Sequence, residues 1–305
     1  SKLADEADVR RVFGERQLPV QLSQHQLATF EALTSDDVDV VINTAMTGDG
    51  KSLAGLLPLL LGKHNLLALF PTNELAQDQL RSSEVALPQW GGNPRDVTQV
   101  SGPILDDLLD GAEHLVRGEV LLRELRNHGL VLSNPDLLHA ITQFAYQQYG
   151  RASTHVVGAL PMLFEQITFD EFHIFDAAQI NAVLTGLLLL YELAQKPFKT
   201  LFLSATPDEH LLRPLHNLGF GPRLKLIEPQ KHGWYKHGAN PGEGWRQILQ
   251  RSDITFVPAR AEEWIVNGAR DVLLPWFEQH GKGAKAAVIV NSAASALRMA
   301  EYLRT

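Results

Sequence analysis

The sequence predicts an α/β fold in which helices cover both faces of a parallel β-sheet, and two observations support this prediction. Short apolar segments alternate with longer amphipathic segments over most of the 305 residues. The short segments are apolar almost throughout, which is typical of strands that are buried on both faces. The chain can bury a full core, and its length suggests about two domains.

Five apolar segments, each bounded by polar or turn residues, are the predicted strands. They are VDVVINT (38–44), NLLALF (65–70), GLVLS (129–133), QITFD (166–170) and KTLFLSA (199–205). Between the strands, apolar residues recur at three- and four-residue spacing, which predicts helices at residues 73–83 and 104–128 among others.

The pattern changes after the fifth strand, and we expect three parts in the chain. A first domain is expected at residues 1–227, followed at 228–282 by an insertion or linker that contains a helix. Residues 283–305, with one strand and one helix, are expected to begin a second domain that is cut short. The aromatic stretch WYKHGANPGEGW (234–245) has two interpretations: a base-stacking or partner surface, and local packing, which we favour.

Composition excludes some classes of protein and leaves others open. The 27 basic and 35 acidic residues give a net charge of −8, which does not indicate a nucleic-acid binder. It does not exclude one, because backbone amides, hydroxyls and a few cations can hold a single strand. There are no cysteines, so disulfides and thiolate metal sites are excluded, which fits a reducing cytoplasm.

We expect no membrane partner and no secretion signal. The apolar runs at 53–62 and 184–194 are shorter than the ~20 residues that a bilayer-spanning helix needs, and they are predicted as buried helices. The first residues lack a basic stretch followed by an apolar core, so no signal peptide is expected.

The stretch AMTGDGKS (45–52) differs from the phosphate-binding pattern G-x-x-x-x-G-K-[ST] only in its first residue, an alanine. Gly48 and Gly50 allow a tight turn that exposes N–H groups, Lys51 can reach the β- and γ-phosphates, and Ser52 can ligate Mg²⁺. A predicted strand ends before the stretch and an apolar helix follows it, as the motif requires. The alternative is a glycine turn before a helix with an exposed lysine.

A second element of such a site is an acid that holds the metal. Asp170 and Glu171 follow the predicted strand QITF directly, so both carboxylates should emerge at the sheet edge that faces the phosphate loop. Asp170 is expected to hold Mg²⁺ through water, and Glu171 to orient and deprotonate the attacking water. An isolated acidic pair would favour a solvated turn, but the adjacent loop favours the nucleotide site.

The order of these motifs resembles that of superfamily 2 DNA and RNA helicases. In that family the loop commonly begins with alanine, so Ala45 is similar to a family marker. Gln26 resembles the upstream glutamine that contacts adenine, and DEFH (170–173) resembles the D-E-x-H box. The resemblance implies a RecA-like fold with ATP and Mg²⁺ as cofactors, and residues 283–305 would begin a second RecA-like domain.

Three further motifs occur in the family's order. PTNELAQ (71–77) and SNPDLL (133–138) resemble segments that contact the nucleic-acid backbone, and SAT (204–206) resembles the motif that couples hydrolysis to movement. Asn73 replaces an arginine found in many relatives, so an amide is expected to replace one charged phosphate contact. Taken singly, these segments also fit a helix capped by Thr72 or Asn73 and a strand end.

Together, the motifs and the resemblance define the predicted site. The catalytic candidates are Lys51, Asp170, Glu171 and His173, although His173 also fits a core histidine. The predicted nucleotide contacts are Gln26, Thr47, Gly48, Asp49, Gly50, Lys51 and Ser52, and the predicted metal ligands are Ser52 and Asp170. The predicted nucleic-acid contacts are Pro71, Thr72, Asn73, Ser133 and Asn134, and the predicted coupling residues are Ser204, Ala205 and Thr206.

Within the superfamily, the motif set is most similar to the stand-alone helicase subunit of subtype I-D CRISPR interference. That resemblance implies an ATP-driven motor in a prokaryotic cytoplasm that moves 3′ to 5′ along single-stranded DNA, recruited by a guide-RNA surveillance complex. None of the twelve histidines precedes an aspartate, so an HD nuclease is expected as a separate subunit. Arginines of the second domain lie beyond this span, and the fragment is expected to hydrolyse ATP slowly.

Three other functions are compatible with parts of the sequence. An RNA helicase would use the same backbone-contacting motifs. An ATP-gated clamp or scaffold would need nucleotide only to fix its conformation, which leaves Glu171 without a purpose. A metabolite kinase would share the phosphate loop but would not explain PTNELAQ or SAT.

Overall fold

The computed structural model describes most of residues 1–249. The gaps are 111–114, 147–149, 153, 206–208 and 239–241, and beyond 249 only 271, 274–279, 281, 295–297 and 300 are described. The chain divides into two units, Ser1–Gln250 and Arg251–Thr305, and the account below concerns the first. The strand expected in residues 283–305, and with it the expected start of a second RecA-like domain, lies outside the described residues.

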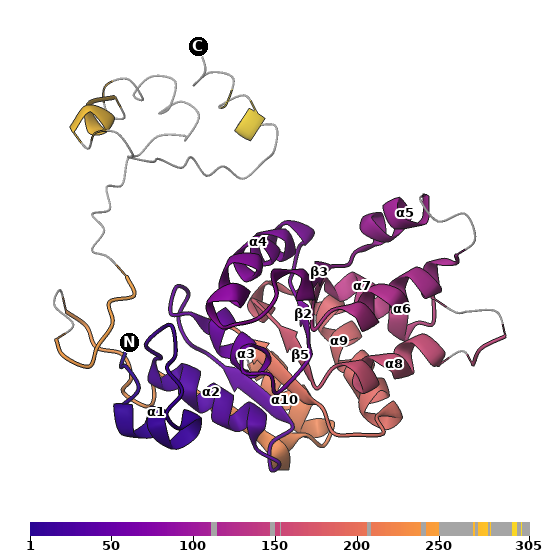
Figure 1. Ribbon diagram of the computed structural model, residues 1–305, viewed down its shortest axis with the longest axis horizontal. Helices are drawn as coiled ribbons and strands as arrows, with labels where there is room; N and C mark the ends of the chain where they lie inside the picture. The colour runs from indigo at the N-terminus through magenta and orange to yellow at the C-terminus, as the bar shows by residue number, and fades with distance from the viewer. Residues whose placement is uncertain are drawn as a thin grey trace. The chain divides into compact units, whose positions relative to one another are not determined.

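Seven parallel strands form one sheet in the order β3-β4-β2-β5-β6-β1-β7 (Figure 1). The strands are β1 Val40–Asn43, β2 Leu66–Leu69, β3 Val97–Gln99, β4 Leu130–Ser133, β5 Gln166–Phe169, β6 Lys199–Leu203 and β7 Leu224–Ile227. The predicted parallel α/β sheet and its five predicted strands are confirmed. The two strands that were not predicted lie at the sheet edges, where burial is incomplete and the apolar signal is weak.

Ten α-helices are described in the first unit. They are α1 Glu6–Phe13, α2 Gln24–Thr34, α3 Lys51–Leu60, α4 Asn73–Gln89, α5 Gly102–Asp110, α6 Arg117–Asn127, α7 Pro135–Thr142, α8 His155–Leu163, α9 Ala177–Leu193 and α10 Glu209–Asn217. The apolar runs at 53–62 and 184–194 lie in α3 and α9 and pack into the core, as expected. None of the helices among the described residues combines the length and hydropathy needed to cross a bilayer.

The helices cover both faces of the sheet, because alternate residues of each strand point to opposite sides. Leu67 and Leu69 of β2 pack in a cluster with residues of α5 to α10. Leu66 and Ala68 of the same strand pack in a second cluster with residues of α1 to α4 (Figure 1). The core is therefore two apolar layers on either side of a buried sheet, as the continuous apolar strands predicted.

The single helix predicted at 104–128 is wrong, because the segment forms α5 and α6. Val116 is extended, with φ −92° and ψ 155°, and its N–H donates to Glu119 Oε2 at 3.2 Å. This contact satisfies a backbone donor at the start of α6, and Arg117 then donates to the Gly102 carbonyl of α5 at 3.0 Å. The apolar period continues through the break, so spacing alone could not reveal it.

Candidate nucleotide and nucleic-acid site

The phosphate-loop stretch lies between β1 and α3, at the edge where the parallel strands end. Gly48 and Gly50 have φ values of 84° and 78°, a region that side chains with a Cβ rarely adopt. A Cβ on Gly50 would lie 2.6 Å from Gln26 Nε2, so this position requires glycine for space as well. Gly50 is the N-cap of α3 and supplies no side-chain cap, which leaves the first N–H groups of the helix available to an anion.

Ser52 and Asp170, which are 118 residues apart, are in direct contact. Ser52 Oγ donates to Asp170 Oδ2 at 2.7 Å, and the Glu171 N–H donates to Asp170 Oδ1 at 2.8 Å. Burial raises the pKa of Asp170, although the Ser52 hydrogen bond opposes the shift. The hydroxyl and carboxylate oxygens fit Mg²⁺, which prefers oxygen ligands and usually binds one or two carboxylates together with phosphates. Accordingly, the described residues hold no cluster of three or more His, Asp or Glu side chains for a metal.

Glu171 has an unusual backbone conformation at the end of β5. Its φ of 49° and ψ of 40° are left-handed, which is uncommon for a non-glycine residue and is found at strained functional positions. Its Oε2 is buried and makes no hydrogen bond to any described residue. His173 Nδ1 lies 3.4 Å from this oxygen, and the His173 side chain is 31% exposed, so the core-histidine interpretation is wrong.

Lys51 and Gln26 are both buried beside the loop. Lys51, the first residue of α3, is 5% exposed, and Gln26 is fully buried. Gln26 Oε1 accepts from the Ser23 N–H at 2.9 Å, and Gln26 Nε2 donates to the Gly50 carbonyl at 3.0 Å. The side chain therefore ties the first turn of α2 to the loop, and its predicted contact with adenine stays a prediction.

The two remaining loop residues differ in exposure. Thr47 is exposed at the turn, as expected of a residue near a bound nucleotide. Asp49 is 0% exposed, and its carboxylate contacts His25, Tyr235 and Arg246 within the protein. Burial opposes its ionisation, but the hydrogen bonds from His25 and Arg246 outweigh burial and lower the pKa of Asp49 to about 2. Asp49 is therefore a structural anion whose carboxylate is not directed at a ligand.

The residues of the two predicted nucleic-acid motifs lie at the N-termini of α4 and α7. Thr72 Oγ1 accepts from the Leu75 N–H at 3.3 Å, which confirms that Thr72 caps α4. Asn134 Oδ1 likewise caps α7 by accepting from the Leu137 N–H at 2.8 Å. Asn134 Nδ2 also donates to Asn73 Oδ1 at 2.8 Å, so the structure brings the two motifs together.

The other motif residues are placed differently. Ser133 is 1% exposed, and its hydroxyl donates to the Val100 carbonyl at 2.7 Å. Pro71 is partly exposed before α4. Ser204 is 3% exposed at the end of β6, where its N–H donates to the Asn43 carbonyl at 3.1 Å, and Ala205 follows. Thr206 lies outside the described residues.

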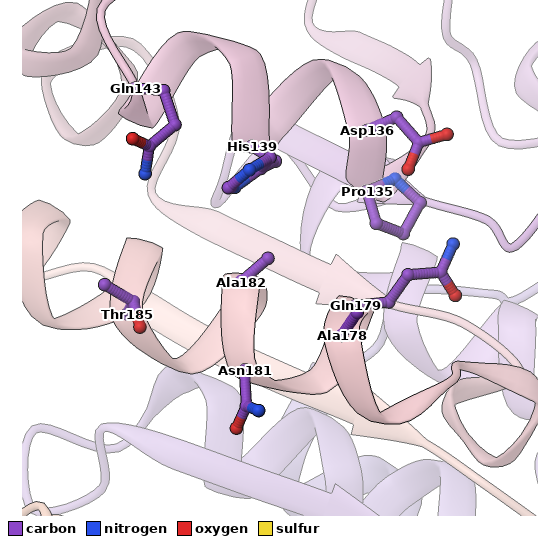
Figure 2. Close-up of a pocket in the computed structure, with 9 residues that line it drawn as sticks. All are labelled: Pro135, Asp136, His139, Gln143, Ala178, Gln179, Asn181, Ala182 and Thr185. Atoms are coloured by element: carbon purple, nitrogen blue, oxygen red, sulfur yellow. The ribbon is translucent and has the colours of Figure 1, made fainter.

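A groove of about 370 Å³ runs between α7 and α9, beginning next to the Asn134 cap. Figure 2 shows Pro135, Asp136, His139 and Gln143 on α7, facing α9 across the groove. The α9 side is lined by Ala178, Gln179, Asn181, Ala182 and Thr185. Apart from Asp136, the polar lining groups are amides, an imidazole and a hydroxyl.

Sequence reasoning missed the residues that hold Asp49. Arg246 and Tyr235 lie 197 and 186 residues from it, in a segment without periodicity. His25 and Asn43 belong to α2 and β1, where they fit ordinary helix and strand positions. The local sequence gives no signal for any of these contacts, except that an aspartate inside a glycine turn needs a partner if it is buried.

The fold and the placement of the loop define a RecA-like nucleotide-binding domain. A family model described as DEAD/DEAH box helicase matches residues 23–213, which is more than half of the chain. The chain therefore belongs to the DEAD/DEAH box helicase family. A search of curated protein sequences found no match.

Solved helicases have the same fold. The DUF1998 helicase MrfA matches 98% of this chain and 40% of its own, with 17% identity and a TM-score of 0.57. A structure of MrfA bound to DNA and AMPPNP matches 75% of this chain and 30% of its own, with 20% identity and a TM-score of 0.49. The DEAD-box helicase Mss116 bound to ssRNA and UDP-BeF matches 72% and 41%, with 18% identity and a TM-score of 0.50. In these comparisons the chain spans less than half of the helicases it matches.

Proposed function

We propose that residues 1–227 are the first motor domain of an ATP-dependent helicase or translocase that acts on single-stranded DNA. The observation that carries this proposal is the 2.7 Å hydrogen bond between Ser52 Oγ and Asp170 Oδ2. It joins the phosphate loop to the acidic motif at the edge of the sheet where RecA-like domains bind nucleotide. In this proposal, residues 228–282 form a linker and residues 283–305 begin the second motor domain.

The chain's own residues divide the work of ATP hydrolysis. The N–H groups at the start of α3 and the ammonium of Lys51 bind the phosphates. Ser52 and Asp170 would hold Mg²⁺, which neutralises charge on the transferring phosphoryl group. Glu171 takes a proton from the attacking water, and the absence of a hydrogen-bond partner for its buried Oε2 among the described residues supports this role. His173, which is 3.4 Å away, orients that carboxylate.

The DNA strand contacts the neighbouring N-termini of α4 and α7. Pro71, Thr72 and Asn73 form one contact and Ser133 and Asn134 the other, with Ser133 acting through the backbone because its side chain is buried. The strand continues along the groove between α7 and α9, whose uncharged polar groups suit bases and sugars more than phosphates (Figure 2). Ser204, Ala205 and Thr206 couple hydrolysis to movement.

The biological setting in this proposal is CRISPR interference, with subtype I-D as the most similar system. Support comes from the motif combination NTAMTGDGKSLAG, PTNELA, SNPDLL and DEFH. The partners would be a guide-RNA surveillance complex and a separate HD nuclease, in a prokaryotic cytoplasm. A family member that unwinds RNA is the second candidate, because the DEAD-box helicase Mss116 is bound to ssRNA in its structure.

The experiment that tests the function is an ATPase assay with DNA or RNA on a chain extended through the second motor domain. Single-stranded DNA should stimulate hydrolysis more than RNA of the same sequence and length. Stimulation by RNA alone would favour the second candidate. ATP binding without hydrolysis, with or without nucleic acid, would favour an ATP-gated clamp.

A paired assay tests the domain assignment. An arginine supplied by a second motor domain is worth roughly a thousandfold or more in rate. The 305-residue chain should therefore bind ATP but hydrolyse it far more slowly than the extended chain at saturating ATP. Equal rates would mean that arginines within this span complete the site.

A further inference from the structure

Residues 234–249 return to the phosphate loop after β7, and their described part, 234–238 and 242–249, is named the strap here. The Met46 N–H of the loop donates to the Tyr235 hydroxyl at 2.7 Å. One guanidinium nitrogen of Arg246 donates to both the Asp49 carbonyl and Asp49 Oδ1 at 2.8 Å. The Ile248 side chain comes within 3.6 Å of the position that a Cβ on Gly48 would occupy. The strap therefore contacts the loop at three successive points.

The buried carboxylate of Asp49 is the centre of these contacts. Besides Arg246, it accepts from the Tyr235 hydroxyl at 3.0 Å and lies 3.1 Å from His25 Nε2. Burial raises the pKa of Tyr235, so the hydroxyl stays protonated and can donate. An isolated buried carboxylate is costly, whereas one with three donors is held in place by all of them.

The donor arrangement around His25 is equally specific. Asn43 Oδ1 accepts from the Ala45 N–H at 2.8 Å, which orients the Asn43 amide so that its Nδ2 is 3.1 Å from His25 Nδ1. Because Nδ2 can only donate, His25 Nδ1 accepts, and the ring proton is on Nε2, facing Asp49. The end of β1, the first turn of α2 and the strap thus converge on a single loop residue.

The strap is itself fixed by the first residues of the chain. The Lys2 N–H donates to the Trp234 carbonyl at 2.8 Å, and the Leu3 N–H donates to the Gly244 carbonyl at 2.9 Å. The Arg246 N–H in turn donates to the Ser1 carbonyl at 2.8 Å. These backbone bonds hold the strap on both sides of Tyr235 and Arg246, so its contacts with the loop do not depend on two isolated side chains.

We propose that the strap sets the shape of the phosphate loop, with Arg246 and Tyr235 as positioning residues that act through Asp49. This inference rests on the ATP-binding role in the proposed function. A loop with two left-handed glycines has many alternative conformations, and fixing it before ATP arrives lowers the entropy cost of binding. Neither side chain is required to touch the nucleotide. The expected effect is on ATP affinity more than on the maximal rate.

Arg246→Ala, Arg246→Lys and Tyr235→Phe in the 305-residue chain test the proposal. Isothermal titration with Mg-ATP should show affinity on the order of tenfold weaker for Arg246→Ala, since a hydrogen bond to a charged group is lost. Arg246→Lys should restore part of the affinity, and Tyr235→Phe should weaken it severalfold while keeping the ring. In the extended chain, the KM for ATP should rise while kcat at saturating ATP stays within about twofold.

Arg223→Ala is the matched control, because Arg223 pairs with Asp39 at 2.6 Å at the opposite end of β1. It should leave ATP affinity unchanged. Unchanged affinity in both Arg246→Ala and Tyr235→Phe would overturn the proposal. So would an equal loss in Arg223→Ala, since that would indicate general destabilisation.

Hydrogen exchange without nucleotide separates this inference from the proposed function. The amides of residues 46–50 should exchange faster in Arg246→Ala and Tyr235→Phe than in the wild type, with Arg223→Ala unchanged. Wild-type exchange rates in both strap variants would overturn the strap proposal even if ATP binds. If the wild type binds no ATP but the exchange rates rise as expected, the proposed function fails and the strap remains a holder of the loop.

Discussion

The N-terminus of α3 and the N-termini of α4 and α7 lie at the same edge of the sheet but are finished differently. Gly50 provides no side-chain cap for α3, whereas Thr72 and Asn134 cap α4 and α7. A side-chain cap satisfies one of the free N–H groups at the start of a helix, and glycine leaves them all open. The α3 terminus is therefore suited to a highly charged phosphate chain, and the other two to weaker contacts along a strand.

The surroundings of the termini differ in the same sense. Buried ionisable side chains, Lys51 and Asp170, lie beside the α3 terminus, whereas uncharged Asn73 and Asn134 link α4 to α7. Charge in a low-dielectric site gives strong and specific binding, and neutral groups give contacts that a moving strand can exchange. Each prediction below tests one side of this comparison.

The largest expected effect belongs to Lys51→Ala. Loss of the ammonium removes charge stabilisation from the phosphates in both the ground and transition states, so ATP turnover should fall on the order of a thousandfold, and ATP binding should largely disappear. Titration calorimetry and ATPase assays on the extended chain measure both. Lys63→Ala, an exposed lysine just beyond α3, should have no effect. Unchanged binding in Lys51→Ala would end the phosphate-loop assignment.

Glu171→Gln should separate binding from hydrolysis. The amide keeps the shape of the side chain but cannot accept a proton from water, so hydrolysis should fall about a hundredfold or more while ATP affinity is kept. The control is Glu165→Gln at the other end of β5, where Glu165 pairs with Lys196. Equal loss of binding and hydrolysis would assign Glu171 a structural role.

Asp49 should make the stability of the domain depend on pH in the acid range. Its folded pKa of about 2 lies below the ordinary value of 3.8, so its stabilising contribution is complete above pH ~5 and is lost as the pH falls toward 2. The shift corresponds to roughly 2 kcal/mol. Urea unfolding of the wild type and Asp49→Asn should show a difference that narrows by this amount between pH 5 and pH 2. A constant difference would mean that the carboxylate charge does not hold the strap.

The smallest effects are expected at the nucleic-acid side. Asn134→Ala removes the cap of α7 and the bond to Asn73 and should destabilise the domain by about 1 kcal/mol. Asn134→Ser keeps a capping oxygen and should restore most of the stability but not DNA affinity. Asn73→Ala should weaken single-stranded DNA binding without changing the salt dependence, because the slope counts neutralised phosphates. A large change in slope, measured by fluorescence anisotropy, would contradict this contact.

Much of the ATP side could be predicted from the sequence because its signals are local. The strand before AMTGDGKS, the glycines at 48 and 50 and the acidic pair after β5 are short-range patterns with a defined structural context. Strand parallelism then placed Ser52 and Asp170 at one edge, and the structure shows them in contact. The order of motifs depends only on the chain and led to the helicase family.

Other features were decided by tertiary structure alone. Asp49 meets Arg246 across 197 residues, and no periodicity marks either residue as a partner of the other. Gln26 turns its amide to Gly50, and the break at Val116 occurs where the apolar spacing continues without interruption. Local patterns report which face of an element is apolar, but pairing between distant polar groups depends on where the packed elements bring them. The sequence by itself therefore determined the class of site and the order of strands along the chain, and the packing decided what holds the phosphate loop in place.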